Sequence, residues 1–175
     1  RAAVCGAYLQ YGDGSFQPQR VFPVVVGATA LAVADMNGDM RPDVVTTSYE
    51  SNNVSILLNA GAGSFAAAKS YSTGTGPAAL AVADFNKDGR MDVVTANLDG
   101  NNISYLQGSG TTAGALNTAR SLSAGRGPVA VIARDVTGDG NVDLLVGNSD
   151  SGDISLLSGR GDGSFVQNPP TGTVN

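Results

Sequence analysis

Residues 79–94 read ALAVADFNKDGRMDVV, and the chain repeats this pattern once before and once after them. The other copies are ALAVADMNGDMRPDVV at residues 30–45 and VAVIARDVTGDGNVDLL at residues 129–145. Their first aspartates are separated by 49 and then 51 residues: Asp35, Asp84 and Asp135. A second marker, Gly-x-Gly-Ser-Phe, keeps the same spacing at Phe16, Phe65 and Phe165, with Leu116 in the remaining place. Two markers that share one period indicate an internal repeat.

Each period contains four segments with the composition of strands. In the first full period they are Ala30–Ala34, Asp43–Thr47, Val54–Leu58 and Phe65–Tyr71. Short Gly- and Asn-containing turns separate them, and no stretch shows a sustained helical period. The sequence therefore predicts an all-β chain with very little helix. Four antiparallel strands per period are typical of a β-propeller blade, and the small side chains of ALAVA suit its crowded innermost strand.

The count of strands predicts about 3.5 blades in one repeat domain, residues 1–175. We expect a half blade at residues 1–25 and blades at approximately 28–75, 77–126 and 128–175. Propellers usually close with four to eight blades, so we expect a fragment of a larger propeller or a chain that self-associates into a homo-oligomer. The last blade is expected to carry its own fourth strand, Phe165–Val174, so two copies do not obviously complete each other. Open blade faces nevertheless favour association.

The composition excludes several classes of function. The 175 residues include no His and a single Cys, so Ser-His-Asp and Cys-His nucleophiles, HExxH zinc helices and internal disulfides are ruled out. Cys5 is expected to be a small buried apolar side chain. The ten Lys and Arg residues are scattered and the formal charge is -5, which argues against nucleic acid as a partner. No apolar run approaches the ~18 residues of a membrane span.

The loop within each copy carries oxygen-bearing side chains at relative positions 1, 3, 5 and 9. Alternate spacing in a tight loop can turn such side chains onto one point, and the backbone carbonyl at position 7 adds a further ligand. Hard oxygen ligands without thiolate or imidazole favour calcium over magnesium. The sequence thus predicts about three Ca²⁺ ions, held by Asp35, Asn37, Asp39, the Arg41 carbonyl and Asp43; by Asp84, Asn86, Asp88, the Arg90 carbonyl and Asp92; and by Asp135, Thr137, Asp139, the Asn141 carbonyl and Asp143.

The distribution of charge supports this interpretation. Nine of the fifteen acidic residues lie in these loops, where they repel one another without a cation. The alternative is that the loops are polar turns, since Asp, Asn and Gly favour turns in any case; that alternative predicts scattered acids instead of three loops in one register.

The three loops depart from one another at particular positions. Position 6 is Gly89 or Gly140 in two loops but Met40 in the first, where a left-handed conformation costs roughly 1 to 2 kcal/mol. Thr137 replaces the amide at position 3. Position 12 carries no Glu, so these are not EF-hand loops. The apolar residue at position 2 is expected to pack between blades: Met36, Phe85 and Val136.

The acidic loops, the NNVSILL segment at residues 52–58 and the GRGDGSF turn at residues 159–165 resemble the FG-GAP or VCBS-type repeat of integrin α-subunit propellers and many secreted bacterial proteins. The similarity covers essentially the whole chain. The resemblance implies a calcium-stabilised propeller, secreted or extracellular, whose faces or blade junctions bind proteins or sugars, with largely architectural calcium.

The leading hypothesis is therefore a calcium-stabilised, extracellular, non-catalytic binding or adhesion module for a glycan or protein. One alternative is the propeller part of a secreted carbohydrate-active enzyme such as a polysaccharide lyase, although the acids outside the loops form no convincing acid/base pair. The other is a purely structural or assembly domain. Tyr11, Tyr49 and Tyr105 are candidate stacking surfaces for sugars, but packing is the favoured role. The Arg160-Gly161-Asp162 tripeptide and the glycosylation patterns at Asn53 and Asn102 are attributed to repeat turns.

Overall fold

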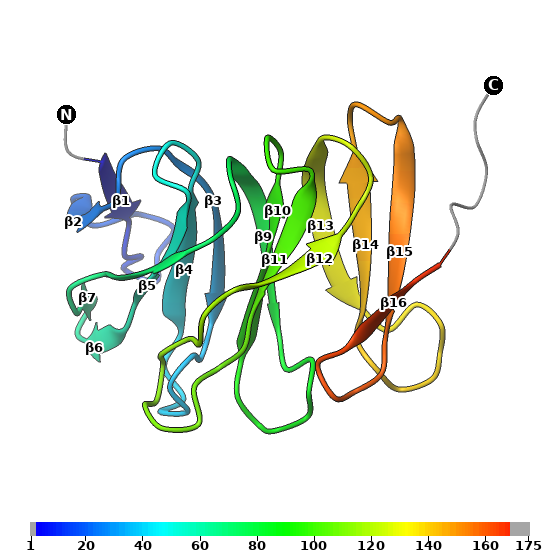
Figure 1. Ribbon diagram of the computed structural model, residues 1–175. Helices are drawn as coiled ribbons and strands as arrows, with labels where there is room; N and C mark the ends of the chain where they lie inside the picture. Colours follow the sequence, from blue (N-terminus) through cyan, green and yellow to red (C-terminus); the bar gives the residue numbers. More distant parts are fainter. Residues whose placement is uncertain (1–2, 169–175) are drawn as a thin grey trace.

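The computed structural model describes residues 3–168 as a row of twisted antiparallel sheets (Figure 1). A half blade contains β1 (Ala3–Ala7) and β2 (Arg20–Val24). Blade 1 contains β3 (Ala28–Ala34), β4 (Asp43–Ser48), β5 (Asn53–Leu57) and β8 (Lys69–Ser72). Blade 2 contains β9 (Pro77–Ala83), β10 (Asp92–Asn97), β11 (Asn102–Leu106) and β12 (Arg120–Ser123). Blade 3 contains β13 (Pro128–Arg134), β14 (Asp143–Asn148), β15 (Asp153–Gly159) and β16 (Phe165–Gln167).

The blades fan out from their first strands, because β9 contacts both β3 and β13. Alanines alternate with larger residues along β3 and β9, so the two faces of each of these strands carry side chains of different size. Leu80 and Val82 of β9 pack toward blade 1, whereas Ala79, Ala81 and Ala83 pack toward blade 3. The sheets do not close into a ring (Figure 1). The prediction of an all-β partial propeller is confirmed. The described residues contain no helix, and hence none that could span a membrane.

The fourth strand of blade 1 differs from the prediction. The segment Phe65–Tyr71 was expected to be one strand, but Phe65 belongs to a small hairpin of β6 (Asn59–Gly61) and β7 (Ser64–Phe65). After this hairpin, β8 pairs antiparallel with β5 and forms the edge of the sheet. The prediction was wrong in blade 1 because Phe65 of the Gly-x-Gly-Ser-Phe marker pairs back on Asn59 and closes the hairpin, whereas Phe165 of the same marker begins β16 in blade 3. In blade 3, β16 is the described part of the expected Phe165–Val174 strand, and the part from residue 169 onward lies outside the described residues.

Two apolar clusters fill the junctions between blades. Met36, Val93 and Leu106 belong to the cluster between blades 1 and 2. Phe85 belongs to the cluster between blades 2 and 3. The centroid of its ring lies 5.6 Å from that of Phe165 and 5.9 Å from that of Tyr105. Burial of such side chains is the main favourable contribution to folding.

The expected packing of the position-2 residues is confirmed for two of the three loops. Met36 and Phe85 are only 5% and 2% exposed. Val136 is 44% exposed, so for this residue the prediction was wrong. The reason is that no further blade lies against blade 3 within residues 3–168.

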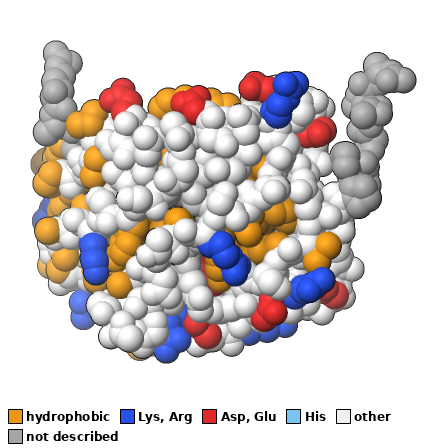
Figure 2. All heavy atoms as spheres, viewed as in Figure 1, with side chains coloured by type: hydrophobic (Ala, Val, Ile, Leu, Met, Phe, Trp, Pro, Cys, Tyr) orange, Lys and Arg blue, Asp and Glu red, His pale blue; other side chains and the backbone are white. Residues whose placement is uncertain are grey.

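The two ends of the row expose apolar side chains that inner blades cover. Leu31 and Val33 of blade 1 are 65% and 59% exposed, although the equivalent Leu80 and Val82 pack against a neighbour. Ile132 on blade 3 is 58% exposed. Apolar atoms also gather on the surface at the half-blade end (Figure 2). Cys5, expected to be buried, is only partly buried there.

Candidate metal centres

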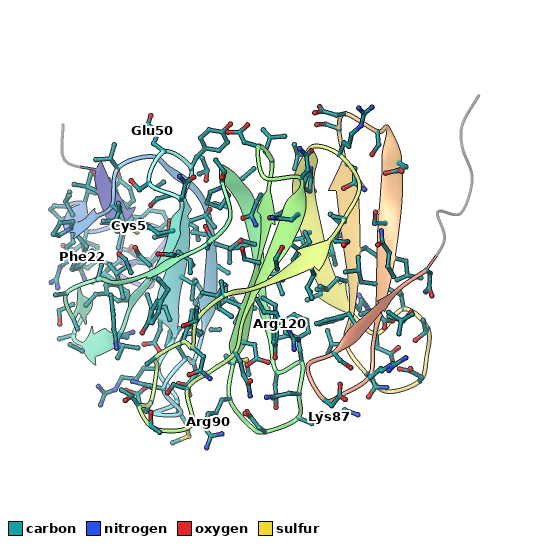
Figure 3. The ribbon with its side chains drawn as sticks, in the orientation of Figure 1. Cys5, Phe22, Glu50, Lys87, Arg90 and Arg120 are labelled. Atoms are coloured by element: carbon teal, nitrogen blue, oxygen red, sulfur yellow. The ribbon has the colours of Figure 1, made fainter. Side chains whose placement is uncertain are left out.

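The three acidic loops connect the first two strands of each blade and lie along one edge of the molecule. Lys87 and Arg90 mark the second loop at this edge, whereas Glu50 lies at the opposite edge (Figure 3). The residue at position 9 is the first residue of the second strand in every blade: Asp43, Asp92 and Asp143. The predicted ligands of each set therefore lie in one loop and in the first residue of the strand that follows it.

The first aspartate of each loop organises the backbone around it. In the first loop, Asp35 Oδ1 accepts the N–H of Gly38 at 2.7 Å and of Asp39 at 3.1 Å, and Oδ2 accepts the N–H of Met40 at 2.7 Å. Partial desolvation acts to raise the pKa of Asp35, but these N–H groups outweigh it, and the pKa lies below its usual value. The other loops repeat the arrangement, with N–H groups bonded to Asp84 and Asp135.

Two backbone positions in each loop have left-handed conformations. At position 6, Met40 has φ 64°, close to the 81° and 82° of Gly89 and Gly140, so the strained conformation expected for Met40 is present. The second is position 4, where Lys87 has φ 59° and the other loops have glycine; this position was not predicted from the sequence. The glycines at position 4 in two of the three loops were the signal that could have identified it.

The aspartate at position 9 is buried and bonded at both oxygens. Asp43 is 0% exposed, and its Oδ2 accepts the N–H of Met36 at 2.8 Å. Its Oδ1 accepts the N–H of Asn59, in the turn after the third strand, at 2.7 Å. Asp92 and Asp143 make the equivalent pair of bonds. This carboxylate therefore ties the loop to the rest of its blade.

The pKa values of two position-9 aspartates shift in opposite directions because their surroundings differ. Asp92 lies beneath Tyr105, whose hydroxyl donates to Oδ2 at 2.9 Å. Burial raises the pKa of Asp92 above its usual value despite the N–H and O–H bonds that oppose the shift. At Asp143 burial also acts to raise the pKa, but the N–H groups of Gly159 and Val136 prevail and lower it.

In the first two loops, the carboxylate at position 5 has a cationic neighbour that was not predicted from the sequence. Arg90 Nη1 lies 3.3 Å from Asp88 Oδ2, and Arg41 Nη1 lies 3.9 Å from Asp39 Oδ2. Both arginines occupy position 7, where only their carbonyls were predicted to act. The third loop has Asn141 there and lacks this compensation. The arginine side chains reduce the repulsion that a cation would otherwise have to relieve.

The chemistry of these residues fits a calcium ion. Every predicted side-chain ligand carries a carboxylate, amide or hydroxyl oxygen, and a carboxylate oxygen that accepts one N–H keeps a further lone pair. The carboxylates are not gathered, however: across residues 3–168 no three acidic, His or Cys side chains converge on a common point. Asp39 is instead bonded to Asn37 Nδ2 at 3.1 Å, and Asp88 to Asn86 Nδ2 at 2.9 Å. The loops supply the appropriate donors in a conformation adapted to their own N–H groups.

The other motifs lie in turns of the repeat. Asp162 of the Arg-Gly-Asp tripeptide accepts the N–H and hydroxyl of Ser164, just as Asp13 accepts those of Ser15. In the glycosylation pattern at Asn102, the side-chain Oδ1 accepts from Asn97 at 2.7 Å and Ser104 is only 3% exposed. These contacts agree with the structural interpretation of both motifs.

Of the three candidate stacking tyrosines, only one has a side chain that is mostly exposed to solvent. Tyr105 is 4% exposed, in agreement with a packing role. Tyr49 donates its hydroxyl to Asp99 Oδ2 at 2.8 Å, which joins blades 1 and 2. Tyr11 is 63% exposed, on the turn of the half blade.

The fold and the loops define a repeat protein built from propeller blades with acidic loops between their first two strands. Comparison with protein families matches the FG-GAP-like repeat twice, over residues 35–95 and 84–146. The chain therefore belongs to the FG-GAP-like repeat family. No curated protein matches it significantly.

Among solved structures, the chain is similar in fold to a lectin from Agrocybe aegerita whose structure explains its specific recognition of non-reducing terminal N-acetylglucosamine. The TM-score is 0.61 at 21% sequence identity, over 95% of this chain and 45% of the lectin chain. The chain thus spans less than half the length of that protein.

Proposed function

We propose that this chain is a calcium-stabilised, non-catalytic module that binds a glycan outside the cell. The observation that carries the proposal is the repeated loop edge: three loops with oxygen donors at the same relative positions lie along one edge of the molecule, in the fold of a known lectin. Repeated loops of this kind suit repeated, modest contacts with a polymer.

Calcium enters the proposal through the mutual repulsion of the loop carboxylates. Each ion would neutralise part of the charge of three aspartates and hold the loop between two strands of its blade. Extracellular modules bind calcium with dissociation constants of about 10⁻⁴ to 10⁻³ M, which matches calcium levels outside the cell. At roughly ten times that constant, each ion stabilises the fold by about 1.4 kcal/mol.

A glycan is favoured as the ligand because of the lectin-like fold and the polar surface. The lectin is described as recognising a terminal N-acetylglucosamine, a neutral sugar. Several carboxylates outside the loops are engaged in structural contacts, such as Asp99 with Tyr49 and Asp153 with Asn148. These contacts support binding over acid/base catalysis.

The open ends of the row support a further part of the proposal. Leu31, Val33 and Ile132 are exposed where the inner blades bury or cover equivalent positions. We infer that these faces are covered in the functional protein, either by further propeller strands or by a second copy of the chain.

Two measurements test the calcium and the glycan separately. Isothermal titration calorimetry should detect about three calcium ions per chain, and a chelator should lower the melting temperature by several degrees. A glycan array probed with calcium present should give hits on neutral, sugar-terminated chains. An unchanged melting temperature on chelation would refute the calcium proposal, and a blank array would refute the glycan proposal.

A further inference from the structure

The half blade has one open strand edge. In the three full blades, the third strand pairs with a neighbour on both sides: β5, β11 and β15. β1 holds the place of a third strand. Val4 of β1 corresponds to Asn53 of β5, because β1 pairs with β2 in the register in which β5 pairs with β8. Within residues 3–168, however, β1 pairs with β2 alone, so the backbone N–H and C=O groups on its other side can accept a further strand.

A hollow of about 340 Å³ lies beside this edge. β1 borders it on one side through Cys5 and both its neighbours, and β3 and β4 border it on the other through Leu31 and Thr46. Cys5 lies in the half blade (Figure 3). The described lining contains no residue of the acidic loops, so the hollow is separate from the candidate metal centres.

The junction between blades 2 and 3 shows what occupies the equivalent place in a full blade. There, Val94 and Ala96 of the second strand β10 lie in one apolar cluster with Val131 of blade 3, which is 8% exposed. Leu31 holds the position of Val131, four residues before the first aspartate of its loop. Leu31 borders the hollow and is 65% exposed, so the hollow is where the side chains of a second strand would lie.

Contacts between strands also place a missing element against β3. In the full blades, the second strand contacts the first strand of the next blade: β4 contacts β9, and β10 contacts β13. First strands contact one another as well, since β9 lies against both β3 and β13. A first and a second strand added to the half blade would therefore lie against β3 and cover Leu31 and Val33. Burial of these apolar side chains is favourable.

The open edge fits a hairpin of two strands. A single strand paired with β1 would leave a new open edge, whereas two strands restore the four-stranded order of the full blades. A second copy of the chain could donate such a hairpin only by breaking up one of its own blades, because the first and second strands of blades 1–3 are already paired within their sheets.

We propose that the half blade binds a β-hairpin from a further FG-GAP-like repeat, built like the first two strands of a full blade. Its second strand pairs with β1, its small apolar side chains enter the hollow, and it adds a fourth acidic loop to the edge that carries the other three. Addition of strands to an open sheet edge is a common mode of recognition. The proposal narrows the proposed covering of the open ends to one occupant at one end, and it depends on neither calcium nor a glycan.

The test uses a synthetic peptide with the sequence of residues 77–97, which form the first two strands of blade 2, and the thiol of Cys5 as the reporter. Cys5 is the only cysteine of the chain and is partly buried beside the hollow, and the peptide contains none. Bound peptide should cover the thiol and slow its reaction with a maleimide by about tenfold or more. Binding of the peptide without protection of Cys5 would overturn the proposal.

Two matched pairs of substitutions locate the contact. In the peptide, Val94→Asp places a charge in the hollow and should abolish the protection of Cys5, whereas Val93→Asp lies on the opposite face of the strand and should preserve it. In the chain, Leu31→Asp should abolish the protection, and Ile132→Asp, which is exposed on blade 3, should not. Protection that survives both Val94→Asp and Leu31→Asp would place the peptide elsewhere and overturn the assignment.

A linked version removes the need for the peptide to fold alone. A copy of residues 77–101 in place of residues 1–3 keeps the spacing of blade 2, because Val4 and Asn102 both correspond to Asn53. In this chain Cys5 should be protected without added peptide, and unchanged reactivity of the thiol would overturn the proposal. Protection that rises with the concentration of the unmodified chain would show that a second copy covers the hollow. That result would also overturn the hairpin, but would leave the proposed covering of the open ends intact.

Discussion

The Thr95 hydroxyl donates to Asn97 Oδ1 at 2.8 Å inside blade 2, where both residues are fully buried. Asn97 Nδ2 donates in turn to Asn102 Oδ1 and Ser104 Oγ, so the network is complete. In blade 3 the equivalent of Thr95 is Val146. Asn148, the equivalent of Asn97, consequently has an Oδ1 without a hydrogen-bond partner.

This difference predicts opposite effects of two mirror substitutions. Thr95→Val removes the donor to a buried acceptor and should lower the free energy of unfolding by about 1–3 kcal/mol. Val146→Thr supplies the missing donor in blade 3 and should leave the free energy of unfolding unchanged or raise it by up to about 1 kcal/mol. Urea denaturation measures both. Equal destabilisation by the two substitutions would contradict the assignment.

The left-handed conformation of Met40 predicts a stabilising substitution. Its side chain is 92% exposed, so Met40→Gly removes strain of about 1–2 kcal/mol and loses no packing. The greater backbone freedom of glycine in the unfolded chain offsets about 0.5–1 kcal/mol of this gain. A net increase of about 0.5–1 kcal/mol should appear in urea denaturation. Gly140→Ala, at the equivalent position of the third loop, should have the opposite sign.

The two kinds of aspartate in the first loop should separate calcium binding from folding. Asp39 is partly exposed, so Asp39→Asn should weaken calcium binding and hardly change the melting temperature in chelator. Asp43 is buried between two N–H donors, so Asp43→Asn should lower stability by about 1–3 kcal/mol even in chelator. Calorimetry and thermal melts with and without calcium compare the two. An Asp43→Asn protein that is destabilised only in calcium would argue against the structural role.

The position-2 residues predict a contrast between an inner and an end blade. Phe85→Ala removes a buried ring from the junction of blades 2 and 3 and should cost about 3–5 kcal/mol. Val136→Ala, at the exposed equivalent, should change stability by less than about 0.5 kcal/mol. Denaturation at low protein concentration measures both. A large effect of Val136→Ala under those conditions would show that blade 3 is covered.

The turn at Asp162 predicts a local pH dependence. The hydroxyl and N–H of Ser164 lower the pKa of Asp162 below the usual value for an aspartate. Because the pKa is lower in the folded state, the stabilisation is present above the unfolded pKa and is lost as the pH falls through the folded pKa. Ser164→Ala should shift the pKa of Asp162 upward in an NMR titration and leave Asp13 unchanged. A pKa of Asp162 that does not respond would show that the N–H alone sets it.

Much of the fold could be predicted because the repeat fixes the order of strands before any single strand is assigned. Asp35, Asp84 and Asp135 mark one position in three blades, and the apolar segments between them leave few possible pairings. The place of Phe65 in the β6–β7 hairpin could not be predicted. An aromatic residue that ends a turn and one that begins a long strand have the same local sequence pattern.

The hydrogen bonds between blades could not be predicted from the sequence either. Asn52 Oδ1 accepts the N–H of Gly76 at 2.8 Å, and the Arg120 side chain donates to the Gly163 carbonyl. Each pair is separated by twenty or more residues and depends on how neighbouring sheets are stacked. The same holds for the loops. Their oxygen ligands could be identified from the sequence, but the hydrogen bond from the Asn59 N–H to Asp43 depends on tertiary structure.

The inner strands β3 and β13 both pack against β9, which directs Leu80 and Val82 toward blade 1 and its alanines toward blade 3. A duplicated copy of residues 77–126 placed between blades would meet surfaces of a kind that already pack together. Tandem duplication of the gene segment for one blade would therefore create no new kind of interface between blades. Each added blade would mainly change the curvature of the row.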